Sequence, residues 1–200
     1  MAIVPSSATA HPLDRWLLDR RSRAHFLRAA ALLALARTLV ASDLSSSEAL
    51  GVLGSELGRT KSIDASRDVV RMRRWIAREL SRARSQEVAF SSLALLVGEG
   101  DPYGVELALA RTRSADEDWG RGITFRSRGR LELDAVGRWL RSVGPRFARD
   151  AAYVLPLAYV ALVARDALAD AVVDPRVRSI RFAYTDGDDI VVRWPRRSHR

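Results

Sequence analysis

Residues 151–164 read AAYVLPLAYVALVA, an apolar run bounded by Asp150 and Arg165. A second apolar run, Ala29–Ala41, is interrupted only by Arg37. Each run is shorter than the roughly 20 apolar residues that a bilayer-spanning helix needs. We therefore interpret both as buried helices around which a core packs, and we expect no membrane association.

Helical periodicity continues on either side of both runs. We expect one helix from Phe147 to Val173 with a kink at Pro156, and one long helix or two between residues 13 and 42. The Ser45–Glu48 stretch offers N-cap residues with an acid in the first turn, and Gly58 would end the helix that starts there. The same patterns predict helices over residues 66–84, 103–112 and 133–143.

The terminal segment changes to alternating periodicity. Apolar residues alternate over 180–184 and again over 190–194, and the turn-forming residues 186–188 lie between them. This pattern predicts a β-hairpin. The apolar faces of its two strands agree only if the loop holds an odd number of residues. The expected pairs are then Tyr184 with Ile190 and Phe182 with Val192.

The hairpin sequence Phe182–Val192, FAYTDGDDIVV, resembles the strand–turn–strand of palm-domain polymerases, in which two aspartates hold magnesium. The resemblance would make Asp188 and Asp189 metal ligands. No earlier strand supplies the other metal-binding aspartate of that family in a recognisable arrangement, and acids with glycine are ordinary turn residues. We interpret the hairpin as an association element without metal chemistry.

These elements together predict a mainly α-helical fold of about six or seven helices with a C-terminal β-hairpin. The expected organisation is a flexible tail over residues 1–11, a helical domain over 12–175, and a hairpin with a basic tail over 176–200 packed on it. Because a lone hairpin is marginally stable, it must pack on the helices, take a third strand such as Ile123–Phe125, or pair with another chain.

Five arginines recur at helical spacing in the segment that starts near Ser66. At about 100° per residue they fall on one face, opposite an apolar face that includes Met72 and Ile76. Neighbouring arginines on a helix repel by about 0.2–0.5 kcal/mol per pair. No acid lies in the centre of this stripe, so a polyanion or an acidic protein surface is the expected partner. The arginine stripe comprises Arg67, Arg71, Arg74, Arg78 and Arg82.

A second basic segment interleaves aromatic residues with arginines. Glycines make its backbone adaptable, so we expect Trp119 or Phe125 to be exposed for stacking on bases, beside Arg121, Arg126, Arg128 and Arg130. A basic tail follows over residues 193–200. Each element alone is typical of a solvated surface from arginine-favouring codon usage, since Lys61 is the only lysine. Three such elements on a chain of net charge +9 favour binding to a nucleic-acid backbone.

The sequence carries no signature of catalysis. It has no cysteine, and its three histidines have no partner at metal-ligand spacing. Glycine-rich phosphate loops and nucleophile elbows are also missing. We therefore expect a non-enzymatic, cytoplasmic subunit without cofactor or metal, which binds nucleic acid inside a larger complex. The alternative is a protein–protein adaptor or structural assembly protein, such as a component of a phage particle or a defence complex, without nucleic-acid contact.

Overall fold

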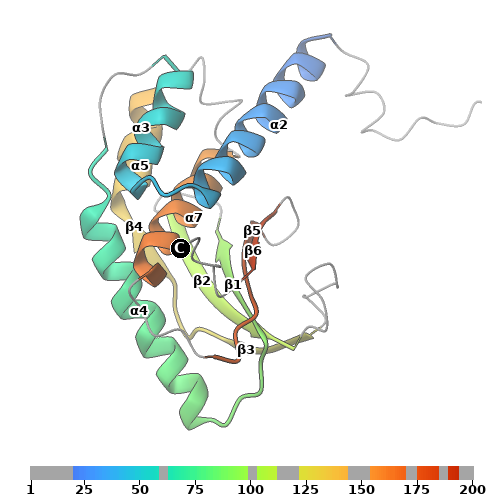
Figure 1. Ribbon diagram of the computed structural model, residues 1–200, viewed down its shortest axis with the longest axis vertical. Coiled ribbons are helices and arrows are strands. Elements are labelled where there is room, and N and C mark those ends of the chain that lie inside the picture. Colours follow the sequence, from blue (N-terminus) through green and yellow to red (C-terminus); the bar gives the residue numbers. More distant parts are fainter. Residues whose placement is uncertain are drawn as a thin grey trace, which may run out of the picture.

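The computed structural model describes residues 20–58, 63–98, 103–111, 122–143, 154–169, 175–184 and 189–193. Within these ranges the protein contains five helices and a six-stranded mixed sheet (Figure 1). The expected mainly helical fold of six or seven helices is therefore wrong. The elements in chain order are α2 (Arg20–Ala41), α3 (Ser46–Glu56), α4 (Ser66–Ser85), β1 (Ser92–Val97), β2 (Tyr103–Ala110), β3 (Ile123–Arg126), β4 (Leu131–Leu133), α5 (Asp134–Val143), α7 (Val154–Ala169), β5 (Ser179–Tyr184) and β6 (Asp189–Arg193).

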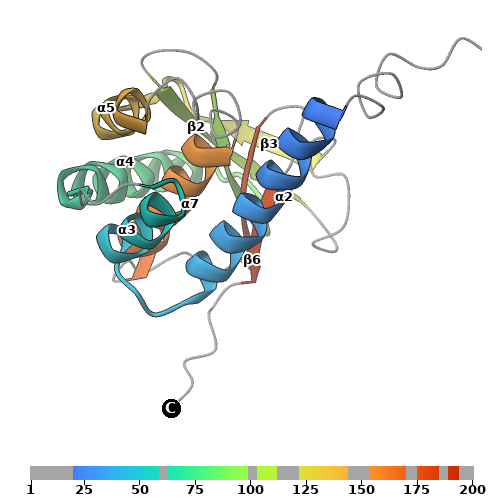
Figure 2. The ribbon, with the colours of Figure 1, turned by 90° about the horizontal axis from the view of Figure 1, so that it is seen from above.

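Helix α7 is the centre of the core. Every residue from Val154 to Arg165 is buried, because α7 contacts β1 and β5 of the sheet as well as α2, α3 and α4. Figure 2 shows α7 with α4 on one side of it and α2 on the other. The apolar run is thus the buried helix that its composition predicted. Pro156 lies in the first turn, where its missing N–H breaks no helical hydrogen bond, and the expected helix start at Phe147 falls outside the described residues.

The sheet has the strand order β3-β2-β1-β5-β6, and β4 also pairs with β2. Strand β1 is antiparallel to β2 and parallel to β5, so that Leu95 lies between Leu107 and Phe182. All six residues of β1 are buried. A strand buried on both faces reads as a continuous apolar run, which the pattern alone does not distinguish from a helix.

Strand β2 replaces the helix that was predicted over residues 103–112. Val105, Leu107 and Leu109 alternate along it and join the main core, whereas Gly104 and Glu106 lie on the opposite face. This is the period of two that a strand requires. The prediction of a helix was wrong because the segment is uniformly rich in alanine and leucine, which favour helices in isolation.

The terminal hairpin exists, but its register differs from the predicted one. Phe182 pairs with Ile190 and Ile180 with Val192, a shift of two residues that keeps the loop odd and leaves the same residues on each face. The hairpin finds its third strand in β1, which pairs with β5. Residues Ile123–Phe125 do form a strand, β3, but it pairs with β2 on the other side of the sheet.

The predicted helix starts are confirmed at α3 and α4. The Ser45 hydroxyl accepts a hydrogen bond from the Glu48 N–H at 3.3 Å, and the Glu48 carboxylate accepts one from the Ser45 N–H at 2.8 Å. The Ser45 hydroxyl also donates to the Glu48 carboxylate at 2.6 Å, and this bond, followed by the one from the Ser45 N–H, lowers the pKa of Glu48 below its ordinary value. Gly58 follows the helix with a φ of +73°, a conformation that glycine adopts without strain. Asp64 accepts a hydrogen bond from the Ser66 N–H at 2.9 Å at the start of α4.

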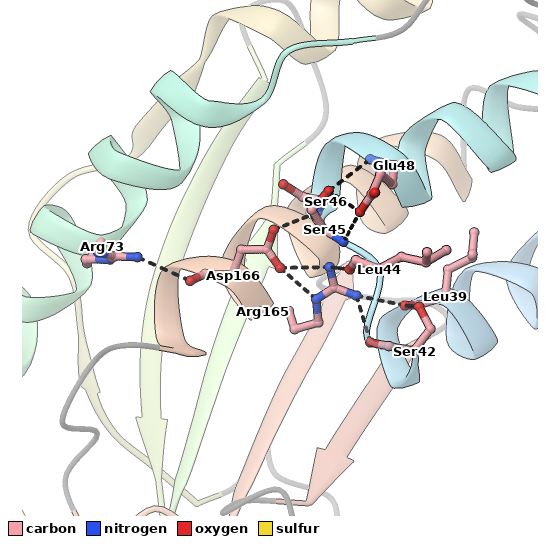
Figure 3. A network of polar contacts seen from close by, with 9 residues as sticks. All are labelled: Leu39, Ser42, Leu44, Ser45, Ser46, Glu48, Arg73, Arg165 and Asp166. Carbon is pink, nitrogen blue, oxygen red and sulfur yellow. Dashed lines mark hydrogen bonds and ion pairs between the residues drawn. The ribbon is translucent and has the colours of Figure 1, made fainter. Parts of the chain in front are cut away.

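A polar network centred on Arg165 joins three helices inside the core (Figure 3). The side chain is only 6% exposed, and its guanidinium donates to Asp166 at 2.8 Å. Asp166 in turn accepts a hydrogen bond at 2.6 Å from the N–H of Ser46 in the first turn of α3. The guanidinium also donates to three backbone carbonyls at and after the end of α2, those of Leu39, Ser42 and Leu44.

Candidate nucleic-acid interface

The arginine stripe runs along α4, which contacts β4. Helix α4 covers the predicted segment and buries the apolar face that contains Met72 and Ile76, so the stripe points away from the core as expected. Its five members nevertheless have different surroundings. Arg67, Arg74 and Arg78 are exposed, whereas Arg71 and Arg82 are partly covered.

Three members of the stripe contact acids of the protein itself; one of them is the exposed Arg78, which lies 3.4 Å from Glu79. Arg71 lies 3.0 Å from Asp134 at the start of α5 and 3.7 Å from Asp68. Arg82 lies 3.1 Å from the buried Glu79. Part of the charge repulsion within the stripe is therefore compensated internally. The spacing of three residues predicts the contacts of Asp68 with Arg71 and of Glu79 with Arg82, whereas the contact with Asp134 of α5 was not predicted.

A buried tyrosine hydroxyl binds one of the two acids that contact Arg71. The Tyr159 hydroxyl donates to Asp68 at 2.9 Å inside the core, and Asp68 is only 3% exposed. Burial first, and then the negative charge of Asp68, raise the pKa of Tyr159 well above its ordinary value. Tyr159, Asp68, Arg71 and Asp134 thus form one chain of contacts from α7 through α4 to α5.

The centre of the stripe lines an open cleft of about 500 Å³ between α4 and the start of β4. One wall carries three arginines of α4 and Trp75, while the other carries a fourth arginine, Leu131 and Glu132. Arg74 is exposed, and within the described part of the chain it makes no ion pair or hydrogen bond. The arginines that line this cleft, hereafter the arginine cleft, are Arg71, Arg74, Arg78 and Arg130. The structure therefore brings two separately predicted basic elements together.

The side chain of Arg130 is positioned by residues of the sheet, an arrangement that we call the seat of Arg130. Its Nε donates to Glu106 at 2.8 Å, and its stem crosses Gly104, where a Cβ atom would lie 2.9 Å from the Arg130 Cδ. A Cβ on Gly98 would lie 3.3 Å from its Nη1. A side chain at position 104 would therefore displace the stem of Arg130, so Gly104 and Glu106 together constrain where its guanidinium lies.

Of the other members of the second basic segment, only Arg126 lies near Arg130, since both contact Glu106. Arg126 lies 3.6 Å from Glu106, and Arg128 is exposed. Phe125 is buried at 7% exposure, and the Arg82 guanidinium covers its ring at 4.6 Å. It cannot serve as the exposed stacking residue that the sequence suggested. Trp119 and Arg121 lie outside the described residues, as does the basic tail after Arg193.

The sequence did not identify the acids and glycines that shape the cleft. Gly104 and Glu106 lie in the segment that was predicted as a helix, so their position beside Arg130 could not be foreseen. Glu132 and Asp134 flank the start of α5, and they contribute negative charge close to the stripe. The alternation of Ile123 and Phe125 would place both on one face, but the register of β2 and β3 shifts between them. Phe125 therefore joins the main core, whereas Ile123 packs against a separate small cluster.

Comparison with known proteins gives no family from which a function could be carried over, since no protein-family model, curated protein or solved structure matches the chain. None of the described helices is long and apolar enough to cross a membrane. Within the same residues no three His, Asp or Glu side chains gather as a metal site would require. Asp188 of the polymerase-like turn lies outside them.

Proposed function

We propose that this protein is a non-enzymatic, cytoplasmic subunit of a larger complex, and that it binds a nucleic-acid backbone through the arginine cleft. The observation that carries the proposal is the meeting of two basic elements in one cleft. Arg74 and Arg78 approach it from α4, and Arg130 approaches it from the sheet. Arginine suits this role because its planar guanidinium offers several donors to phosphate oxygens.

The surroundings of the cleft favour an external anion as the partner of its central arginines. Two members of the stripe connect α4 to other elements, since Arg71 pairs with Asp134 of α5 at 3.0 Å and Arg82 donates to the Arg126 carbonyl of β3 at 2.8 Å. Arg78 is 72% exposed and has only its neighbour Glu79 at 3.4 Å. Arg74 and Arg78 therefore present positive charge to solvent from a rigid element, a geometry that positions a backbone without reading bases.

An acidic protein surface is the competing partner, as in the adaptor alternative. One observation favours the adaptor alternative: among the described strands, β6 pairs only with β5, so a strand of another chain could extend the sheet there. The two partners differ in their response to salt. Phosphate binding weakens steeply with salt because bound arginines release counterions from the nucleic acid.

The test replaces the two exposed arginines of the cleft in the variant R74Q/R78Q. Affinity for random-sequence oligonucleotides should fall, and the slope of log affinity against log salt should decrease by about 0.7 per lost contact on a single strand or 0.9 on B-DNA. Folding should be unchanged, because neither side chain is part of the core.

The matched control is R111Q/R178Q, which removes the same charge from two other exposed arginines. Arg111 follows the last residue of β2, about 24 Å from Gly104 at roughly 3.4 Å per residue. The control should bind with an almost unchanged salt slope. Equal losses in both variants would show that only net charge matters, and unchanged binding in R74Q/R78Q would refute the proposal.

A further inference from the structure

We infer that the arginine cleft binds single-stranded nucleic acid with higher affinity than duplex. The inference rests on the proposed function and narrows its ligand. Three features of the cleft carry it, namely its size, the placement of arginines on both walls, and the carboxylate at its border.

The size of the cleft suits one nucleotide unit. A volume of about 500 Å³ falls in the range of about 300–1,000 Å³ that is typical of sites for small molecules. A duplex is far larger, since its major groove alone is about 12 Å wide. A duplex could touch the rim of the cleft, whereas a single strand can place a phosphate and its sugar between the walls.

Arginines on facing walls can hold such a phosphate from two sides. Arg74 and Arg78 belong to α4, and Arg130 belongs to the opposite wall. The bond from Arg130 Nε to Glu106 uses one of the five N–H donors of the guanidinium. The remaining donors can bind an anion. Gly104 and Glu106 constrain the position of the guanidinium before binding.

The other lining residues suit an unpaired nucleotide. Trp75 and Leu131 add apolar surface to the cleft, which can cover part of a sugar or base. The exposed Glu132 places a carboxylate beside the arginines, and carboxylates accept hydrogen bonds from base amino groups. In a duplex one N–H of each amino group is used in the base pair, and the other can be reached only from a groove, whereas an unpaired base offers both. A duplex also carries one negative charge per about 1.7 Å of its axis, so Glu132 repels it more strongly than it repels a single strand.

The experiment compares one short labelled oligonucleotide with the same oligonucleotide annealed to its complement, as DNA and as RNA, by fluorescence anisotropy at fixed salt. The wild-type protein should bind the single strand about tenfold more tightly or better, the effect of one charge-assisted hydrogen bond. R74Q/R78Q should lose that preference, and R111Q/R178Q should retain it. In E132Q the ratio of single-strand affinity to duplex affinity should fall, because the loss of the negative charge improves duplex binding.

Each outcome bears on a separate claim. Equal or tighter binding of the duplex by the wild-type protein would overturn the single-strand inference and leave the proposed function standing. A preference for the single strand that survives in R74Q/R78Q would move the discrimination away from the cleft and also refute the inference. Binding of neither probe would refute the proposed function, and the inference with it.

Discussion

Replacing Arg165 by methionine should strongly destabilise the protein. Methionine retains much of the apolar stem but removes the guanidinium from a site that is only 6% exposed. Three carbonyls at and after the end of α2 then lose a charged donor. Asp166, 25% exposed, loses its cation and keeps only the hydrogen bond from the Ser46 N–H.

The expected loss follows from these contacts. Removal of one partner from a buried ion pair costs about 3–5 kcal/mol. Asp166 is partly exposed and keeps one hydrogen bond, but the three carbonyls that lose the guanidinium add to the loss. A domain of this kind is stable by about 5–15 kcal/mol in total. For a chain of 200 residues each kcal/mol shifts the melting temperature by about 2–4 °C. Arg165→Met should therefore lower Tm by roughly 6–20 °C.

Thermal and urea unfolding, followed by circular dichroism, measure this loss. The matched control is Arg74→Met, the same chemical change at an exposed position without a partner in the described chain, which should change stability by about 0.5 kcal/mol or less. In the double variant R165M/D166N the unpaired charge is absent and the amide oxygen can still accept from Ser46, so part of the loss should return. A Tm for Arg165→Met within about 2 °C of the control would refute the reasoning.

Two further predictions concern the Tyr159 hydroxyl and Gly104, the glycine that leaves room for the Arg130 side chain. Because the folded pKa of Tyr159 is raised, its contribution to stability is fully present below the unfolded value of about 10 and is lost as pH rises above it. Tyr159→Phe should be less stable by about 1–3 kcal/mol at pH 7, since Asp68 loses its donor, and its urea-unfolding curve should converge with that of the wild type at alkaline pH; a parallel decline would contradict this. Gly104→Ala should weaken single-strand binding to the level of Arg130→Gln, because its Cβ displaces the Arg130 stem. Gly51→Ala is the control, as its Cβ meets nothing within 4 Å, and equal affinity of the two alanine variants would show that the seat is not needed.

Local signals in the sequence predicted α3, α4, α5, the apolar run of α7 and the hairpin, whereas the helix expected over 103–112 is β2. The capping residues before α3, the apolar faces of α4 and α5 and the run within α7 depend on neighbours a few residues apart, and the structure confirms them. The N-cap of α4 is Ala65, whose side chain makes no capping hydrogen bond. The hairpin was recognised by its turn residues and alternation. Its register was missed by two residues because a shift of two preserves the apolar face, so the sequence pattern satisfies both registers.

Local patterns did not predict strands β1 and β2. Their assignment depends on partners far along the chain, and β1 shows no alternation because both of its faces are buried. The same limit applied to the site. The spacing of the arginine stripe was visible locally, whereas the seat of Arg130 arises only when β2 pairs with β4 and places Gly104 opposite Glu132.

The parallel pairing of β1 and β5 has a consequence for how the chain acquires its fold. Ser92 and Ser179, which face each other across this pairing, are 87 residues apart in sequence. A nascent chain can close β1 on β2 early, but the other side of β1 has no partner until most of the protein has been synthesised. Pairings between such distant segments slow folding and leave a strand edge open to other chains meanwhile. Protection of β1 amides from hydrogen exchange should therefore appear late during refolding, together with that of β5.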